Sequence, residues 1–117
     1  MPIRLPADLV ASLRRDYQER TVCVTGGAGF IGSHTVDALM AVGARITVLD
    51  DLSNSTADHV LELVELEPDR VRFVHASVLD RAAVAAAVRG ASLVVRLAAI
   101  GSVPRSMEEP RRVFDVN

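Results

Sequence analysis

The most informative absence in this sequence is lysine. All 13 basic residues of the 117-residue chain are arginine, so the chain has no lysine for a Schiff base, a P-loop or a catalytic tyrosine–lysine pair. Tyrosine occurs once, at Tyr17, tryptophan is missing, and aromatic residues make up only 3% of the chain. Base stacking on aromatic side chains is therefore not expected, and the net charge of −2 does not favour nucleic acid either.

Cysteine, metal-binding patterns and long apolar runs are also scarce. The single cysteine, Cys23, excludes an internal disulfide and a cysteine-rich metal site. The three histidines, His34, His59 and His75, share no metal-ligand spacing. No apolar run reaches the ~18 residues of a membrane span, and the charged first 20 residues lack a signal-peptide core. These features favour a cytoplasmic protein without metal, nucleic-acid or membrane partners.

Short β-rich runs alternate with helical patterns along the chain, which is typical of an α/β protein with a parallel sheet. The strands are expected at Thr21–Thr25, Arg45–Asp50, Val71–His75 and Leu93–Leu97. The helices are expected at Ala7–Glu19, Phe30–Val42, Ser55–Glu67, Arg81–Val88 and from Glu108 to Asn117.

Apolar side chains at helical spacing predict which faces of these helices pack inward. The first helix carries such a stripe and is expected to pack on the outside of the fold. The predicted stripes are Leu9, Val10, Leu13 and Tyr17 in the first helix, Ile31, Val36, Leu39 and Met40 in the second, and Val60, Leu61, Val64 and Leu66 in the third.

A glycine-rich turn follows the first strand, in the stretch VCVTGGAGFIGSH from Val22 to His34. Within it, GAGFIG (Gly27 to Gly32) fits the pattern G-x-G-x-x-G, between a predicted strand and a predicted helix. Glycine permits a tight turn and a close approach of the backbone to a pyrophosphate. The helix N-terminus offers N–H groups to the anion, so we expect a dinucleotide phosphate site here.

An acidic residue closes the second strand: Asp50 lies eighteen residues beyond Gly32. A carboxylate at this place can accept both hydroxyls of an adenosine ribose and repels a 2′-phosphate. The pattern therefore predicts NAD rather than NADP as cofactor. The alternative is a purely structural glycine turn with an incidental Asp50.

The stretches TGGAGFIGSH and VLDDLSNS, continued through LAAIGSVPRSMEEP to DVN, resemble the extended short-chain dehydrogenases of the NAD-dependent epimerase/dehydratase family. In that family's turn, T-G-x-x-G-x-x-G, the glycines are Gly26, Gly29 and Gly32, and Gly27 is an extra one. The resemblance implies a Rossmann-like parallel sheet with flanking helices, here four strands in the order 3-2-1-4. It divides the chain into an N-terminal helical extension (1–20) and the N-terminal part of an NAD-binding domain (21–117).

The resemblance also implies individual site residues. Asp50 would bind the adenosine ribose, Ser77 and Val78 would flank the adenine, and Asn117 would close over the cofactor. At Ser77 the family usually has an aspartate. The implied cofactor site comprises Gly26, Gly29, Phe30, Ile31, Gly32, Asp50, Asp51, Asn54, Ser55, Ser77, Val78, Leu97, Ala98, Ala99 and Asn117; Ser102 and Ser106 would meet a sugar substrate.

The segment SVPRS most resembles UDP-hexose and UDP-N-acetylhexosamine 4-epimerases, which use transient hydride transfer to NAD. A dehydratase or a decarboxylase of the same family shares this cofactor half. The family's chemistry needs a tyrosine and a lysine four residues apart, and this chain has neither after the glycine turn. We therefore expect the cofactor half of a longer enzyme, without catalysis by these 117 residues alone. The alternatives are a non-catalytic NAD-binding module and a truncated product.

A four-stranded version of this sheet leaves the outer edge of the last strand, LVVRLAA, without a neighbour. Unpaired apolar edges invite pairing with another chain. The sequence therefore predicts dimerisation or aggregation through this edge.

Overall fold

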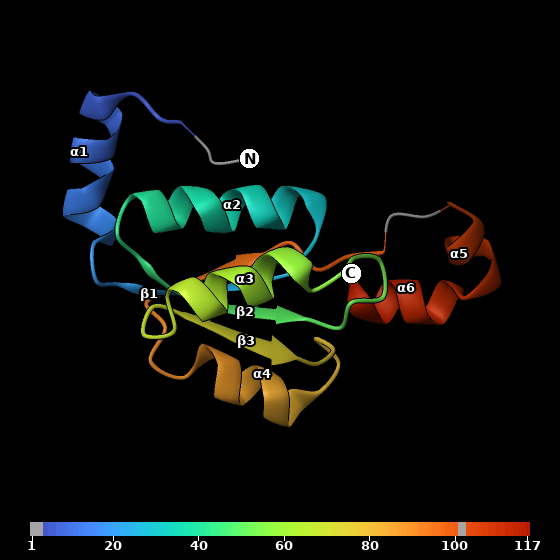
Figure 1. Cartoon of the computed structure of the whole chain (residues 1–117). Coiled ribbons are helices and arrows are strands. Elements are labelled where there is room, and N and C mark those ends of the chain that lie inside the picture. Colours follow the sequence, from blue (N-terminus) through green and yellow to red (C-terminus); the bar gives the residue numbers. More distant parts are fainter. Residues whose placement is uncertain (1–3, 101–102) are drawn as a thin grey trace.

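A parallel sheet forms the middle layer of the fold (Figure 1). Within residues 4–100 and 103–117, which the computed structural model describes, it has four strands in the order β3-β2-β1-β4, as predicted. The strands are β1 (Thr21–Thr25), β2 (Arg45–Asp50), β3 (Val71–His75) and β4 (Leu93–Arg96). The first three have the predicted bounds, and β4 ends one residue before the predicted Leu97.

Helices cover both faces of this sheet (Figure 1). α2 and α3 lie on one face and α4 on the other, whereas α1, α5 and α6 lie at the two ends of the molecule. Their bounds are α1 (Ala7–Tyr17), α2 (Phe30–Ala41), α3 (Asp58–Leu66), α4 (Arg81–Val88), α5 (Val103–Glu108) and α6 (Pro110–Val116).

The core has one cluster on each face because side chains alternate along a strand. On the face covered by α2 and α3, the buried residues are Val22, Val24, Val36, Ala44, Ile46, Val48 and Val60. On the α4 face they are Cys23, Leu49 and Ala87. β1 and β2 supply most of both clusters, so the carboxyl ends of these two strands are held firmly.

Local sequence signals mark the ends of two helices. Gly43, with φ +85°, follows the end of α2, as expected of a C-terminal glycine. The side chain of Asp80 caps α4 by accepting a hydrogen bond from the N–H of Ala83 at 3.1 Å. The end of α2 and the start of α4 therefore both follow from contacts made within a few residues of the sequence.

Some predicted inward positions were wrong. Ile31 is 66% exposed, because it lies in the first turn of α2 beyond the sheet, and Leu61 and Leu66 of α3 are also exposed. Leu63, which was not predicted, packs against the core instead. α3 also begins at Asp58 rather than Ser55.

The ends of the chain differ most from the prediction. α1 ends at Tyr17 rather than Glu19, because Glu19 adopts φ +64°, outside the helical region. Residues 103–108 form a helix that was not predicted, and α6 begins at Pro110 rather than at Glu108. Among the described residues, no helix combines the length and apolar character needed to cross a bilayer.

Candidate functional site

The glycine-rich turn connects the carboxyl end of β1 to α2, and Gly26 is its first tight point. Gly26 has φ +75°, and a Cβ on it would lie 2.7 Å from the backbone nitrogen of Ala98. Its own N–H donates to the carbonyl oxygen of Leu49 at 2.8 Å. The turn is therefore packed directly against the chain that leaves β4, with no space for a side chain.

Two further glycines are required by packing within the turn. A Cβ on Gly32 would lie 2.0 Å from the carbonyl oxygen of Gly26, and one on Gly27 would lie 2.7 Å from Cγ1 of Val48. A Cβ on Gly29 would meet only the carbonyl oxygen of Gly26, at an ordinary 3.4 Å. Gly27, the extra glycine of the motif, thus allows α2 to pack closely on the sheet. Gly29 is not needed for packing, and it leaves space beside the turn for a ligand.

The first turn of α2 has no side-chain cap. In the described part of the chain, the N–H groups of Phe30, Ile31 and Gly32 have no acceptor, and the first N–H to find one is that of Ser33, with the carbonyl oxygen of Gly29 at 2.8 Å. Free N–H groups and the helix dipole give this end a partial positive charge. Such an arrangement binds anions, phosphate groups in particular.

Asp50 ends β2 beside this turn and is only 9% exposed. Its Oδ2 accepts a hydrogen bond from the N–H of Ala28 at 3.0 Å, and its Oδ1 accepts one from the N–H of Leu52 at 2.9 Å. A carboxylate has about four acceptor positions, so both oxygens can still accept a hydroxyl proton. The site therefore places a buried acceptor next to an anion-binding helix end.

A cleft of about 360 Å³ joins these parts at the carboxyl edge of the sheet. It runs from the loop after β2, past the glycine-rich turn, to the segment after β4. Its lining comprises Gly26, Gly29, Phe30, Ile31, Gly32, Asp50, Ser53, Asn54, Ser55, Leu97, Ala98 and Ala99. All but Ser53 are predicted site residues. Ser53 was missed, although it belongs to the same polar run SNS as Asn54 and Ser55.

Other predicted site residues lie outside this lining. Burial alone raises the pKa of Asp51, but hydrogen bonds from Ser53 and the charge of Arg112 outweigh it, so the pKa lies below its ordinary value. Ser77 accepts a hydrogen bond from the N–H of Leu79 at 3.1 Å, and Val78 packs on the core cluster of Cys23. These three residues follow β2 and β3, near the Asp50 end of the cleft.

Asn117 bonds to the segment that follows β4. Its Oδ1 accepts from the N–H of Ile100 at 2.7 Å, and its Nδ2 donates to the carbonyl oxygen of Ile100 at 3.2 Å. Asn117 thus connects the end of α6 to the chain next to Ala99, without lining the cleft itself. Ser106 lies half-buried on α5 and is not among the lining residues, and Ser102 lies outside the described residues.

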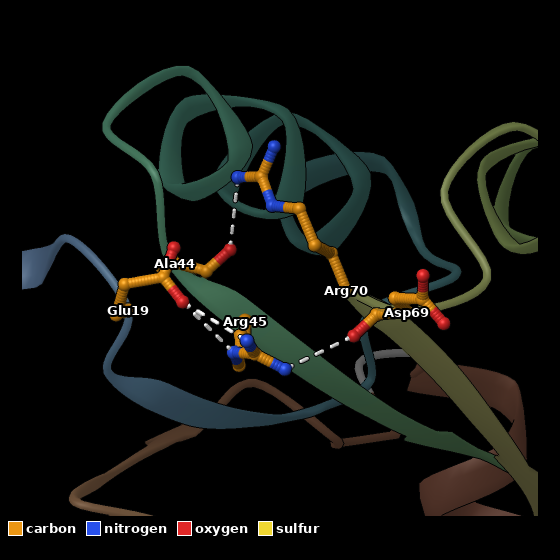
Figure 2. A network of polar contacts seen from close by, with 5 residues as sticks. All are labelled: Glu19, Ala44, Arg45, Asp69 and Arg70. Atoms are coloured by element: carbon orange, nitrogen blue, oxygen red, sulfur yellow. Dashed lines mark hydrogen bonds and ion pairs between the residues drawn. The ribbon is translucent and has the colours of Figure 1, made fainter.

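A larger hollow of about 540 Å³ lies at the opposite, amino end of the strands and contains Arg45, Arg70, Arg72 and Arg89. Figure 2 shows that the side chains of Arg45 and Arg70 already bond to other groups of the protein. Arg45 bonds to Glu19 at 3.0 Å, and Arg70 donates to the carbonyl oxygen of Ala44 at 3.1 Å. We therefore assign this hollow a structural role and place the functional site at the carboxyl edge.

The histidines have separate local partners. His34 bonds to the carbonyl oxygen of Phe30 at 2.7 Å, His59 to Asp37 at 2.8 Å, and His75 to the carbonyl oxygen of Asp51 at 3.2 Å. Among the residues that the structure describes, no three potential ligands gather to hold a metal ion.

The turn, the open helix end and the acidic residue closing β2 stand in the order that dinucleotide-binding α/β folds of the Rossmann type require. The chain is a protein of that class. It belongs to the NAD dependent epimerase/dehydratase family, whose model matches residues 22–117. The family that the sequence resembles is thereby confirmed.

Curated relatives and solved structures agree with this assignment. The UDP-glucose 4-epimerase of Bacillus subtilis is 38% identical over 98 residues, which are 82% of this chain and 29% of that protein. The UDP-glucose 4-epimerase of Thermus thermophilus, solved with NAD, is 39% identical with a TM-score of 0.69, covering 82% of this chain and 29% of that one. The chain spans about 30% of the length of these relatives and corresponds to their N-terminal part.

An epimerase of Methanothermobacter thermautotrophicus extends the structural similarity. It is 28% identical with a TM-score of 0.80, and the match covers 94% of this chain and 32% of that one. Residues 21–117 make up less than 94% of the 117-residue chain, so they alone cannot account for the matched part. The match therefore includes part of the segment before β1, where α1 lies.

Proposed function

We propose that this chain binds NAD in the cleft at the carboxyl edge of its sheet. The observation that carries the proposal is the contact between Asp50 and the glycine-rich turn, with the carboxylate 3.0 Å from the N–H of Ala28. It places a buried hydroxyl acceptor and an anion-binding helix end on the same cleft. The residues fit the cofactor, since Gly29 leaves space above the turn and Gly26 and Gly32 keep the turn tight.

The cleft supports one direction for the bound dinucleotide. The adenosine ribose would lie at Asp50, beside Asn54 and Ser55. The pyrophosphate would lie against the free N–H groups at the start of α2. The nicotinamide end would then extend toward Leu97, Ala98 and Ala99, because these line the other end of the cleft. Asp51, Ser77 and Val78 would border the adenine.

The preference for NAD over NADP follows from Asp50. Asp50 is only 9% exposed, and its carboxylate lies where a 2′-phosphate would sit. Two negative groups in a poorly solvated place repel each other strongly. No arginine lines the cleft in the part of the chain that the structure describes, so nothing there compensates that charge.

We further propose that the cofactor serves a UDP-sugar 4-epimerase, the activity of the relatives named above. Bound NAD would supply reversible hydride transfer with the sugar. This chain would bind and orient the cofactor, with Ser102 and Ser106 toward the sugar and Asn117 holding the segment after β4. It has no lysine, and its one tyrosine lies on α1, so these 117 residues alone should not catalyse epimerisation.

Three further assignments, of domains, of self-association and of location, complete the proposal. Residues 1–20, which include α1, would be an N-terminal extension, and residues 21–117 would be the N-terminal part of an NAD-binding domain. The free edge of β4 pairs with another chain, because Leu93 and Val94 are 43% and 42% exposed there. A cytoplasmic location suits the buried free thiol of Cys23.

The test compares NAD and NADP binding to the wild-type chain and to Asp50→Asn by isothermal titration calorimetry. We expect wild type to prefer NAD. We expect Asp50→Asn to bind NAD about tenfold to a hundredfold more weakly, since it loses a charge-assisted hydrogen bond of about 1.5–3 kcal/mol. The same variant should lose much of the discrimination against NADP. Unchanged affinities for both nucleotides would contradict the role of Asp50.

A further inference from the structure

The contact between Asp50 and Ala28 has a consequence for the turn itself. Ala28 lies at the tip of the turn between Gly27 and Gly29, and its N–H would otherwise be one of the free donors near the helix start. The Oδ2 of Asp50 accepts a hydrogen bond from this N–H at 3.0 Å, and its Oδ1 accepts one from the N–H of Leu52 at 2.9 Å. The carboxylate is therefore fixed from both sides.

The remaining anchors of the turn lie on either side of its tip. Gly26 is bonded to the carbonyl oxygen of Leu49 at 2.8 Å before the tip, and Ser33 to that of Gly29 at 2.8 Å after it. The N–H of Gly29 reaches the carbonyl oxygen of Gly26 at a longer 3.2 Å. Since glycines surround Ala28, the backbone there has wide conformational freedom. Asp50 supplies the side-chain contact that restricts it.

We infer that Asp50 is a positioning residue for the phosphate site: its bond to Ala28 holds the glycine-rich turn so that the N–H groups of Phe30, Ile31 and Gly32 point into the cleft. This inference rests on the proposed cofactor site. It gives Asp50 a role toward the pyrophosphate, in addition to its role toward the ribose. The two roles are compatible, because each carboxylate oxygen keeps an acceptor position free for a hydroxyl.

The two roles predict opposite signs for a ligand without ribose. If Asp50 acts on the ribose alone, removing its negative charge leaves the binding of inorganic pyrophosphate unchanged or makes it tighter, because a nearby repulsion disappears. If Asp50 positions the turn, the same change weakens pyrophosphate binding, because the donor groups lose their arrangement. The sign of the effect therefore separates the roles.

The experiment measures inorganic pyrophosphate binding to the whole 117-residue chain by isothermal titration calorimetry. In Asp50→Asn, the NH₂ group of the amide cannot accept from an N–H. We expect this variant to bind about threefold to tenfold more weakly, as the loss of one hydrogen bond implies. The control, Asp58→Asn, removes the same charge from a position outside the cleft lining and should bind pyrophosphate as wild type does.

Amide hydrogen exchange of the ligand-free protein provides a second readout that does not depend on NAD. The N–H of Ala28 should exchange faster in Asp50→Asn than in wild type, while that of Cys23, inside β1, should not change. If Asp50→Asn does not fold, Asp50→Ser takes its place. A pyrophosphate Kd that is unchanged or lower in the variant, or an unchanged exchange rate at Ala28, overturns the inference. If wild type binds neither NAD nor pyrophosphate, the proposed function fails, and the exchange rate of Ala28 alone decides whether Asp50 holds the turn.

Discussion

Single glycines in the phosphate turn have different tasks, although the sequence motif treats them alike. A Cβ on Gly32 would come within 2.0 Å of the carbonyl oxygen of Gly26, so Gly32 is needed for the turn to close. A Cβ on Gly29 would meet nothing closer than 3.4 Å, and Gly29 lines the cleft. One glycine thus serves the fold and the other leaves room for a ligand.

This difference gives a prediction for two alanine variants. Gly32→Ala should destabilise the protein by about 1–3 kcal/mol or more, because the backbone of the turn must move to make room for the methyl group. Gly29→Ala should fold with nearly wild-type stability and yet bind NAD more weakly, because its methyl group occupies the cleft. Urea denaturation and NAD titration of both variants check the pair. Equal stability of the two variants would contradict this division of tasks.

At the residue scale, the sequence predicted most residues that line the cleft, because local chemistry places them there. Gly26, Gly32 and Asp50 were predicted because a turn–helix junction and a strand end have recognisable spacing. The packing of Gly27 on Val48 was not predicted, since it depends on how closely α2 approaches the sheet. The hydrogen bond from Ala28 to Asp50 was likewise not predictable from the sequence, because the two residues are 22 positions apart.

At the scale of elements, strands were predicted more accurately than helices. β1 (TVCVT) and β2 (RITVLD) are rich in β-branched residues and are buried on both faces after their first residue, so their bounds follow from composition. Short helices depend on tertiary packing, and this is why α3 begins three residues later than expected. Pro110 separates α5 from α6, because proline suits the first turn of a helix but not the interior of one that continues.

The connection between α2 and the sheet depends on Arg70. Its Nη2 donates to the carbonyl oxygens of Met40 and Ala44, both at 3.1 Å, at the end of α2 (Figure 2 shows the second bond). Arg70→Met should therefore destabilise the protein by about 1–3 kcal/mol, since two carbonyls lose a charged donor. Chemical denaturation measures this value.

Arg45→Met is the matched control, because Arg45 pairs with Glu19 where both side chains are about half exposed or more. Exposed ion pairs contribute about 0–1 kcal/mol, so this variant should lose little stability. Equal losses for Arg70→Met and Arg45→Met would show that Arg70 does not hold the end of α2.

A second prediction at this scale concerns Asp51, between β2 and α3, and Arg112 of α6. Burial raises the pKa of Asp51, but bonds from Ser53 and the charge of Arg112 bring it below its ordinary value. Because the folded pKa is the lower one, Asp51 stabilises the fold above its unfolded pKa of about 3.9. This contribution is lost as the pH falls below that value through the folded pKa.

Arg112→Gln should move the pKa of Asp51 upward, as followed by the NMR titration of its carboxyl carbon. Arg111→Gln is the control, since Arg111 is far more exposed and pairs weakly with Asp115 at 3.9 Å. In Asp51→Asn, the loss of stability below about pH 4 should be smaller than in wild type. An unchanged Asp51 titration in Arg112→Gln would remove the link between α6 and the loop after β2.

For the whole molecule, the main feature is a parallel sheet with one open apolar edge. Leu93 and Val94 on β4 are exposed to more than 40%, whereas every residue of β1 and β2 after the first is buried. We expect the chain to self-associate through this edge in sedimentation experiments. Val94→Lys should yield monomers, since lysine on an edge strand opposes pairing. Leu61→Lys, at an exposed position of α3, should self-associate as wild type does. A wild-type chain that stays monomeric at high concentration would contradict edge pairing.

The most direct test of the account is an NMR titration of the ¹⁵N-labelled chain with NAD. We expect saturable shifts of the amide signals of Phe30, Ile31 and Gly32, together with those of Leu97, Ala98 and Ala99, because the cofactor should span the cleft between them. NADP should cause smaller shifts at the same concentration. If NAD leaves these signals unchanged, or shifts only signals at the amino end of the sheet, the cleft is not a cofactor site.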